Sequence, residues 1–369
     1  MTAPLIIIGT GLAGYSVARE WRKLDPDTPL VIFCADSGDF YSKPLLSTAL
    51  THQKAPDDLA MASFKEMGKT LNAQIFTFTE VTNIDPTAKT VMADGKSHAY
   101  SQLVLATGAS PIHLEMLQAV GASSVNSLDA YRTFRRKLQP NQHVVIVGAG
   151  LVGSEFAHDL STSGHKVTVI AKESAPLNTF IPEQFGKQLQ EKMEDMKVTY
   201  HLNATLQAAE KVEEQTKLTL DNGVTVLGDT VLSAVGIRAK LDLANAAGLA
   251  VSRGIIVDDC LQTSDECIFA LGDAIEQQGE VRQYIAPIMH QARALAKTLA
   301  GDRTVVVYPA MPVVVKTPSF PITFVRPNEF DVEEVTENKT LYFKNGKLVG
   351  FLLVGDANKE RAMIMAQLV

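Results

Sequence analysis

Two stretches of this sequence share one pattern, in which a short apolar run leads directly into three glycines at fixed spacing. Residues 5–8 read Leu-Ile-Ile-Ile and residues 144–147 read Val-Val-Ile-Val, as expected for parallel strands buried on both faces. A helical pattern follows each set of glycines, and a second apolar run follows each helix, at residues 30–33 and 167–170. The sequence therefore predicts an α/β fold with two Rossmann-like strand–turn–helix–strand domains.

Each glycine in these turns has its own mechanical role. The glycines are Gly9, Gly11 and Gly14 in the first turn and Gly148, Gly150 and Gly153 in the second. The first glycine of a set allows the tight turn, the second lets the backbone approach a pyrophosphate, and the third lets the helix pack against the strand. A diphosphate then rests on the helix N-terminus. We therefore predict one dinucleotide at each turn, with Thr10, Leu12 and Ala13 in the first binding loop.

The ends of the second strands distinguish the two units. Asp36 lies 22 residues past Gly14, where a carboxylate accepts the ribose hydroxyls of an adenosine. In the second unit Ala171 occupies the place where such an acid is usual, and Lys172 follows it. Lys172 suits a 2′-phosphate, but no second basic residue follows before Asn178, so a phosphate clamp is incomplete. This pattern favours NADH in the second unit and leaves NADPH open.

Composition limits the other functions that the chain can have. The formal net charge of −7 argues against a nucleic-acid or anionic-membrane surface, since both favour clustered Lys and Arg. No apolar run reaches the roughly 18 residues of a membrane span. Because the run at residues 5–8 already belongs to a core strand, we expect no cleavable leader and predict a cytoplasmic protein.

The cysteines and histidines show no spacing that is typical of a redox or metal centre. Cys34, Cys260 and Cys267 form no Cys-x-x-Cys or Cys-x4-Cys pair, so we expect three buried free thiols rather than an electron-carrying dithiol. None of the eight histidines pairs with a Cys or a carboxylate at metal-ligand spacing. His290 is expected on a helix surface or in the core, and no metal site is predicted.

Three further segments identify the broader family that this chain resembles. They are an apolar strand that ends in Thr107 and Gly108, a strand and turn at residues 233–238 that contains Gly236, and a strand at residues 268–271 that leads to Gly272 and Asp273. In this order they resemble the two-dinucleotide flavoprotein reductases with a glutathione-reductase-like fold, over residues 5 to about 301. The resemblance implies non-covalent FAD in the first unit, NAD in the second, and Asp273 on the ribityl chain of the flavin.

The same resemblance implies how the domains are threaded. The FAD-binding domain would comprise residues 1–112 and 237–306, and the NAD-binding domain, residues 113–236, would be inserted into it. Residues 307–369 would form a small α+β domain. Its predicted strands are residues 312–317, 321–325, 340–343 and 348–354, followed by a short helix.

A segment after Asp36 narrows the resemblance. Residues 40–47 read Phe-Tyr-Ser-Lys-Pro-Leu-Leu-Ser, which is similar to a segment of ferredoxin- and rubredoxin-type reductases. Disulfide-reducing members carry two redox cysteines in this region, and here there are none. The resemblance implies that residues 311–318, Met-Pro-Val-Val-Val-Lys-Thr-Pro, take the place of the Trp-containing strand usual in ferredoxin reductases, and the only tryptophan is Trp21. The chain thus resembles the rubredoxin reductases of bacterial alkane-hydroxylating systems.

The resemblance assigns roles to particular residues. Lys43 would lie beside the flavin ring, Glu155 would lie near the nicotinamide and pair with Lys43, and Lys316 would approach the flavin from the C-terminal domain. A backbone amide at Val81 would meet the adenine. Ile285 would lie at the opening of a helix spanning residues 288–300, whose N-terminus would face the flavin.

The function implied is electron transfer from NADH through FAD to rubredoxin, in a monomeric protein that serves an alkane hydroxylase. Three alternatives remain at this point. The acceptor is a [2Fe-2S] ferredoxin, or the chain is the reductase component of a nitrite reductase, or it is a non-catalytic flavoprotein that senses NAD.

Overall fold

The computed structural model describes residues 3–368 of the chain, which divide into two compact units. Unit 1 comprises residues up to Ser42 together with Ala60–Ser110 and Ile237–Pro309. Unit 2 comprises Lys43–Leu59, Pro111–Gly236 and the residues from Ala310 onward. In this division the segment Lys43–Leu59 groups with the second glycine turn rather than with the first, to which it is adjacent in the sequence.

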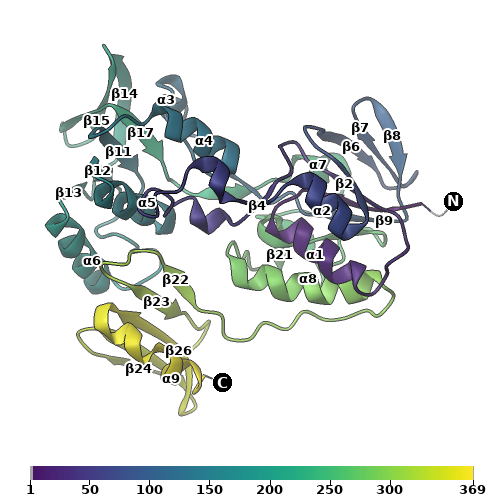
Figure 1. Ribbon diagram of the computed structural model, residues 1–369. Coiled ribbons are helices and arrows are strands. Elements are labelled where there is room, and N and C mark those ends of the chain that lie inside the picture. Colours follow the sequence, from purple (N-terminus) through teal and green to yellow (C-terminus); the bar gives the residue numbers. More distant parts are fainter. Residues whose placement is uncertain (1–2, 369) are drawn as a thin grey trace. The chain divides into compact units, whose positions relative to one another are not determined.

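Unit 1 is built on a five-stranded parallel sheet with strand order β20-β9-β1-β2-β5. These strands are β1 (Leu5–Ile8), β2 (Leu30–Phe33), β5 (Ala73–Phe76), β9 (Gln102–Leu105) and β20 (Ile268–Ala270). Helices α1 (Leu12–Arg22) and α8 (Ile285–Leu299) lie side by side in this unit (Figure 1). The apolar residues of the sheet and of these helices belong to one buried core.

Smaller elements complete unit 1. The other helices are α2 (Phe64–Leu71), α7 (Asp242–Ala246) and the 3-10 turn η3 (Gly272–Ala274). The antiparallel strands are β6 (Val81–Asp85), β7 (Thr90–Ala93) and β8 (Lys96–Ala99), and β3 (Phe40–Tyr41) pairs with β4 (Ala60–Ala62). Two further pairs are β10 (Ala109–Pro111) with β18 (Ile237–Ala239) and β19 (Ile255–Val257) with β21 (Ile275–Gln277).

Unit 2 contains a second parallel sheet, with strand order β13-β12-β11-β17. Its strands are β11 (His143–Val147), β12 (Lys166–Ile170), β13 (Val198–His201) and β17 (Thr230–Ser233). Its helices are α3 (Glu115–Ala119), α4 (Leu128–Lys137), α5 (Leu151–Thr162) and α6 (Glu183–Asp195), and η1 (Lys43–Leu45) and η2 (Pro56–Leu59) are 3-10 turns. An antiparallel sheet of β14 (Leu206–Val212), β15 (Gln215–Leu220) and β16 (Thr225–Gly228) adjoins them.

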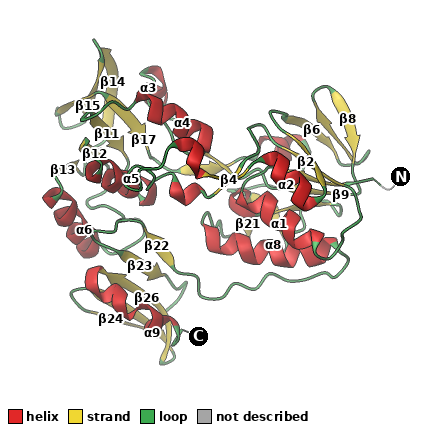
Figure 2. Cartoon of the chain, in the orientation of Figure 1, coloured by secondary structure: helices red, strands yellow, loops and turns green. Residues whose placement is uncertain are grey.

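The C-terminal part of unit 2 is an antiparallel sheet with strand order β22-β23-β26-β25-β24 (Figure 2). The strands are β22 (Val313–Val315), β23 (Ile322–Val325), β24 (Val332–Val335), β25 (Lys339–Lys344) and β26 (Lys347–Val354), followed by η4 (Gly355–Glu360) and α9 (Arg361–Met365). The sequence missed β24. All four of its residues are exposed, and Val-Glu-Glu-Val lacks the alternation that marks a half-buried strand.

The predicted fold is confirmed, with two Rossmann-like parallel sheets and a small α+β region at the C-terminus. Helix α8 differs from its prediction, because it begins at Ile285 rather than at residue 288. Pro287 therefore lies in the first turn of α8, where its missing N–H removes no helical hydrogen bond. Within residues 3–368, no helix combines the length and the apolar character that crossing a membrane requires.

Candidate functional site

The first glycine turn connects β1 to α1 through backbone contacts that exclude side chains. Gly9 has φ +117°, and a Cβ on it would overlap the carbonyl oxygen of Ala106. A Cβ on Gly14 would overlap the carbonyl oxygen of Gly9. At Gly11, by contrast, a Cβ would meet no atom of residues 3–368 within 4 Å, and no side chain of this range caps α1, which begins at the next residue. The N-terminal N–H groups of α1 therefore face open space, as a diphosphate site requires.

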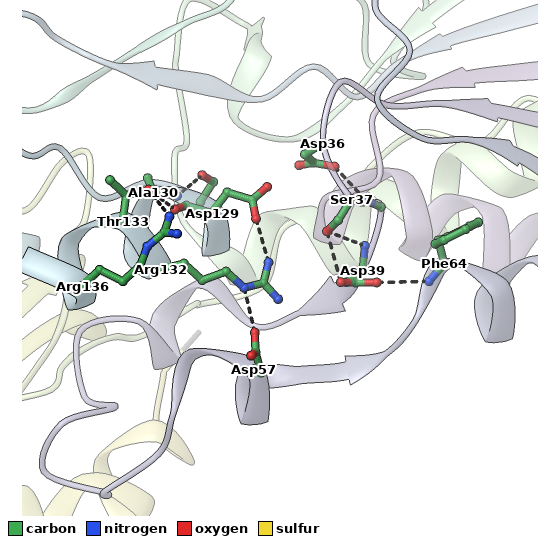
Figure 3. A network of polar contacts seen from close by, with 12 residues as sticks. Asp36, Ser37, Asp39, Asp57, Phe64, Asp129, Ala130, Arg132, Thr133 and Arg136 are labelled. Atoms are coloured by element: carbon green, nitrogen blue, oxygen red, sulfur yellow. Dashed lines mark hydrogen bonds and ion pairs between the residues drawn. The ribbon is translucent and has the colours of Figure 1, made fainter.

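Asp36 lies in the loop that follows β2. Its Oδ1 accepts hydrogen bonds from Thr10 Oγ1, at 3.3 Å, and from the backbone N–H of Gly38, at 3.0 Å. Figure 3 shows how the loop is fixed further, because Asp39 accepts from Ser37 Oγ at 3.1 Å and from the Phe64 N–H at 3.4 Å. A carboxylate has about four lone-pair positions, so Asp36 keeps acceptor capacity for ribose hydroxyls.

Two strand ends in unit 1 carry polar groups that suit a ligand. After β9, the Thr107 hydroxyl is buried without a hydrogen-bond partner in the described residues, and Gly108 adopts φ +67°. After β20, a Cβ on Gly272 would lie 2.8 Å from Ala13 Cβ, so Gly272 brings Asp273 and the first glycine turn close together. The orphaned Thr107 hydroxyl at the end of the sheet is the observation that most directly fits a bound cofactor.

The remaining predicted FAD contacts also lie in unit 1. Ile285 is the first residue of α8, which has no side-chain cap and no acidic residue in its first turn. Its N–H groups are therefore available for a negatively charged ring edge. Val81 is the buried first residue of β6.

The second glycine turn repeats the first almost contact for contact. Gly148 has φ +110°, and a Cβ on it would overlap the carbonyl oxygen of Ala234, while a Cβ on Gly153 would overlap that of Gly148. A Cβ on Gly150 would meet nothing within 4 Å, and α5 has neither a side-chain cap nor an acidic residue in its first turn. The second turn therefore also offers an open helix N-terminus that fits a diphosphate.

Other predicted nucleotide-binding residues surround the carboxyl ends of the second sheet. After β12, Ala171 is buried and Lys172 is exposed. After β17, Gly236 has φ +114°, and the Ser233 hydroxyl at the strand end is buried without a partner among the described residues. Orphaned hydroxyls thus occur at a strand end of each parallel sheet, and both sets of residues fit a dinucleotide.

Glu155 is a buried carboxylate on the first turns of α5, with an exposed fraction of 6%. Lys316 donates to it from Nζ, at 3.0 Å to Oε1 and 3.1 Å to Oε2, and from its backbone N–H, at 3.1 Å to Oε1. Ser47 Oγ donates to Oε2 at 2.5 Å. The ion-pair partner that the structure describes for Glu155 is Lys316, and the predicted pair of Glu155 with Lys43 stays a prediction.

Lys43 occupies a different place in unit 2. It begins η1, and its Nζ lies 3.4 Å from Asn126 Oδ1, one residue before the N-cap of α4. The other end of the Lys43–Leu59 segment is also held to α4. Arg132 donates to Asp57 Oδ1 from Nε, at 2.9 Å, and to Asp129 Oδ1 from Nη1, at 2.7 Å (Figure 3).

Sequence reasoning missed two buried residues on α5, His158 and Asp159. Asp159 accepts the backbone N–H groups of Leu50, at 3.1 Å, and Thr51, at 2.8 Å, and burial raises the pKa of its carboxyl. His158 Nε2 accepts the backbone N–H of Ser319 at 3.3 Å, and burial lowers the pKa of its imidazole. No local pattern marks these two residues, because titratable side chains on helices are usually exposed and only the fold buries them here.

The three cysteines are free thiols. Cys34 and Cys260 are buried as expected, and burial raises the pKa of the Cys34 thiol to about 11. Cys267 differs from the expectation because it is only partly buried, and Lys89 Nζ lies 3.0 Å from its sulfur.

Comparison with known protein families identifies the family to which these two glycine turns belong. Residues 3–294 match the model of the pyridine nucleotide-disulphide oxidoreductases. The chain belongs to this family. Residues 305–368 match a second model, described as a rubredoxin binding C-terminal domain. The oxidoreductase uses FAD and NAD(H) as its cofactors, in agreement with the two open glycine turns.

Individual relatives match this oxidoreductase over nearly its whole length. The rubredoxin-NAD(+) reductase of Acinetobacter baylyi is 40% identical over 387 aligned positions, which cover 99% of this chain and 98% of the relative. The enzyme of the same name from Alcanivorax borkumensis is 39% identical over 99% of this chain and 98% of its own. A ferredoxin reductase from Rhodopseudomonas palustris shares the fold, with a TM-score of 0.89 at 24% identity, over 100% of this chain and 96% of its own.

Proposed function

We propose that this oxidoreductase passes electrons from NADH through FAD to rubredoxin. The observation that carries the proposal is the match of residues 305–368 to a rubredoxin binding C-terminal domain. The name of the Acinetobacter baylyi relative supports it. So do the free cysteines, since a chain without a redox dithiol has to deliver electrons from the flavin to another molecule.

The proposed domains follow the two sheets. Residues 1–112 and 237–306 bind FAD, residues 113–236 bind NADH, and residues 307–369 contact the acceptor; of these, residues 1, 2 and 369 lie outside the described part. The proposed FAD contacts are the first turn from Gly9 to Gly14, Asp36, Lys43, Val81, Thr107, Gly108, Asp273, Ile285 and Lys316. The proposed NADH contacts are Gly148, Gly150, Gly153, Glu155, Lys172 and Gly236.

The chain contributes electrostatics and positioning to the reaction. When bound, FAD accepts a hydride from NADH and can release the two electrons one at a time. The open N-terminus of α5 holds the diphosphate of NADH, and the ion pair with Lys316 fixes the buried Glu155 carboxylate in place. Lys43 supplies positive charge that favours the reduced, anionic ring. We propose Lys43, Glu155 and Lys316 as the catalytic residues on this basis.

An acceptor panel tests the function. The purified protein should be yellow, and NADH should bleach its flavin under anaerobic conditions. With cytochrome c as the final acceptor, NADH plus rubredoxin should support a higher rate than NADH plus a [2Fe-2S] ferredoxin, and NADPH should replace NADH poorly. A colourless protein, or equal rates with both carriers, contradicts the proposal. A flavin that is bleached but passes electrons to no carrier identifies an NAD-sensing protein instead.

The setting of the reaction forms part of the proposal. We place the protein in the cytoplasm, as a monomer that supplies electrons to an alkane hydroxylase. Sedimentation of the FAD-loaded protein checks the monomer. Growth of a deletion strain on a medium-chain alkane checks the pathway, because loss of the reductase should abolish growth on the alkane but not on the corresponding fatty acid.

A further inference from the structure

The segment Lys43–Leu59 contains turns but almost no regular structure, and unit 2 holds it by side-chain contacts at intervals. Its interior hydrogen bonds are local turn bonds, such as Leu46 N–H to Lys43 O at 3.0 Å and Lys54 N–H to Ala49 O at 2.9 Å. A segment of this kind is free to shift unless another element fixes it. Its contacts with α4 and α5 therefore determine where its side chains lie.

The contacts with α5 are buried and repeat with the helical period. Glu155 and Asp159 are one turn apart on α5 and so face the same side of the helix. Glu155 accepts a hydrogen bond from Ser47. Four residues further along both the helix and the segment, Asp159 accepts one from Thr51. The segment thus runs alongside α5 over this turn, and both anchoring carboxylates are buried.

Asp159 is the stronger of the two candidates for a purely positional role. Its side chain is 1% exposed, and its two oxygens accept two consecutive backbone N–H groups, those of Leu50 and Thr51. A carboxylate that holds two backbone amides fixes main chain rather than one rotatable side chain. Burying it is unfavourable, as its raised pKa reflects, yet the fold keeps this carboxyl buried where it binds two backbone N–H groups of the segment.

We propose that Asp159 is a positioning residue that fixes the Lys43–Leu59 segment on the nicotinamide-binding helix and so sets the place of Lys43. The inference rests on the proposed function, in which Lys43 acts on the flavin. Helix α5 then does three things with successive residues. Its N-terminus receives the dinucleotide, Glu155 holds Lys316, and Asp159 holds the segment that begins with Lys43.

Asp159→Asn is the direct test, made in the FAD-loaded full chain. The amide keeps the size of the carboxylate but replaces one acceptor oxygen with a donor, so one of the two backbone N–H groups loses its partner. Amide hydrogen exchange of the segment should speed up, by about tenfold at Leu50 or Thr51. Flavin bleaching at saturating NADH should slow by about tenfold or more, since small misplacements of a reacting group reduce rates by up to ~10². The KM for NADH should be unchanged.

A double-mutant cycle separates positioning from general damage. If Asp159 acts through Lys43, then Asp159→Asn combined with Lys43→Met should bleach no more slowly than Lys43→Met alone. The flavin midpoint potential should follow the same non-additive pattern. Asp57→Asn is the matched control, since it removes an exposed anchor of the same segment and should change neither exchange at Leu50 nor the bleaching rate.

The outcomes distinguish this inference from the proposed function. Wild-type protein that NADH does not bleach contradicts the proposed function. Wild-type protein that bleaches normally, together with unchanged exchange in Asp159→Asn or with additive losses in the double variant, overturns the positioning role alone. If Asp159→Asn does not retain FAD, Asp159→Glu takes its place, because it keeps both acceptor oxygens but moves them by one methylene. Faster exchange at Leu50 or Thr51 together with slower bleaching then supports the role, whereas faster exchange with wild-type bleaching, or slower bleaching with wild-type exchange, overturns it.

Discussion

Helices α1 and α5 begin from nearly identical glycine turns, yet their next two turns differ. At the positions where α5 has Glu155, His158 and Asp159, α1 has Ser16, Arg19 and Glu20. The three residues of α5 are buried and bonded to other segments of unit 2, while Arg19 and Glu20 are partly exposed.

The glycine turn and the helix face that follows it therefore determine different things, namely nucleotide binding and the packing of distant segments. The glycines create the same open helix N-terminus in both units. The helix face decides what else the unit holds. Helix α5 holds distant segments with the buried Glu155 and Asp159. Helix α1 instead uses the partly exposed Arg22, which donates to the carbonyls of Leu71 and Asn72.

The largest effects are expected at the third glycine of each turn. Gly14→Ala and Gly153→Ala each place a Cβ against a carbonyl oxygen, so overpacking should cost about 1–3 kcal/mol or more. Gly14→Ala should yield protein without flavin colour. Gly153→Ala should keep its flavin and lose bleaching by NADH. Absorbance spectra with and without NADH check both variants, and loss of FAD in Gly153→Ala would contradict the assignment of the turns.

Glu155→Gln should have the next largest effect. It removes the charge that pairs with Lys316 inside the protein, where hydrogen bonds to charged groups contribute about 1.5–3 kcal/mol. We expect the free energy of unfolding to fall by roughly that amount in urea titrations and NADH oxidation to slow. Ser16→Ala is the matched change on α1 and should cost less than half as much. Equal losses would show that the two helix faces do not differ as described.

The buried His158 of α5 should make the stability of the protein depend on pH, and α1 has no histidine at the matched position. Burial lowers the pKa of this imidazole below its ordinary 6.5, so the unfolded chain binds the proton first as the pH falls. The stabilisation is complete above about pH 6.5 and decreases toward the lowered pKa, by at most about 1.4 kcal/mol per pH unit. Melting temperatures at pH 7.5 and 5.5 should therefore fall more for wild type than for His158→Gln. A parallel decrease in both proteins would rule out this role.

Exposed ion pairs should give the smallest effects. Arg132→Ala removes the pairs with Asp57 and Asp129, and Lys23→Ala removes the pair with Glu20 on α1. Such pairs contribute about 0.2–1 kcal/mol, and salt screens them. Both variants should unfold within 1 kcal/mol of wild type, with the difference vanishing at about 1 M salt. A larger loss of unfolding free energy in Arg132→Ala would show that α4 contributes more to holding the Lys43–Leu59 segment than an exposed ion pair does.

The sequence predicted the parts of this structure that local patterns encode. The strands at residues 5–8 and 30–33 lie where expected, because an apolar run before a glycine turn leaves little freedom. The predicted start of α8 at residue 288 is three residues too late, because the first turn of the helix accommodates Pro287. The ion pair of Glu155 with Lys316 joins residues 161 positions apart, and no spacing rule connects them. Asp159 escaped notice because a lone acid in a helix is usually exposed, and only its burial in the fold marks it.

The grouping of Lys43–Leu59 with unit 2 constrains how such proteins can be recombined. The chain leaves unit 1 after Ser42 and returns at Ala60. A chimera that exchanges only the contiguous nicotinamide module, residues 111–236, would separate this segment from Glu155 and Asp159 and leave two buried carboxylates without their donors. A successful graft therefore has to transplant three discontinuous pieces at once.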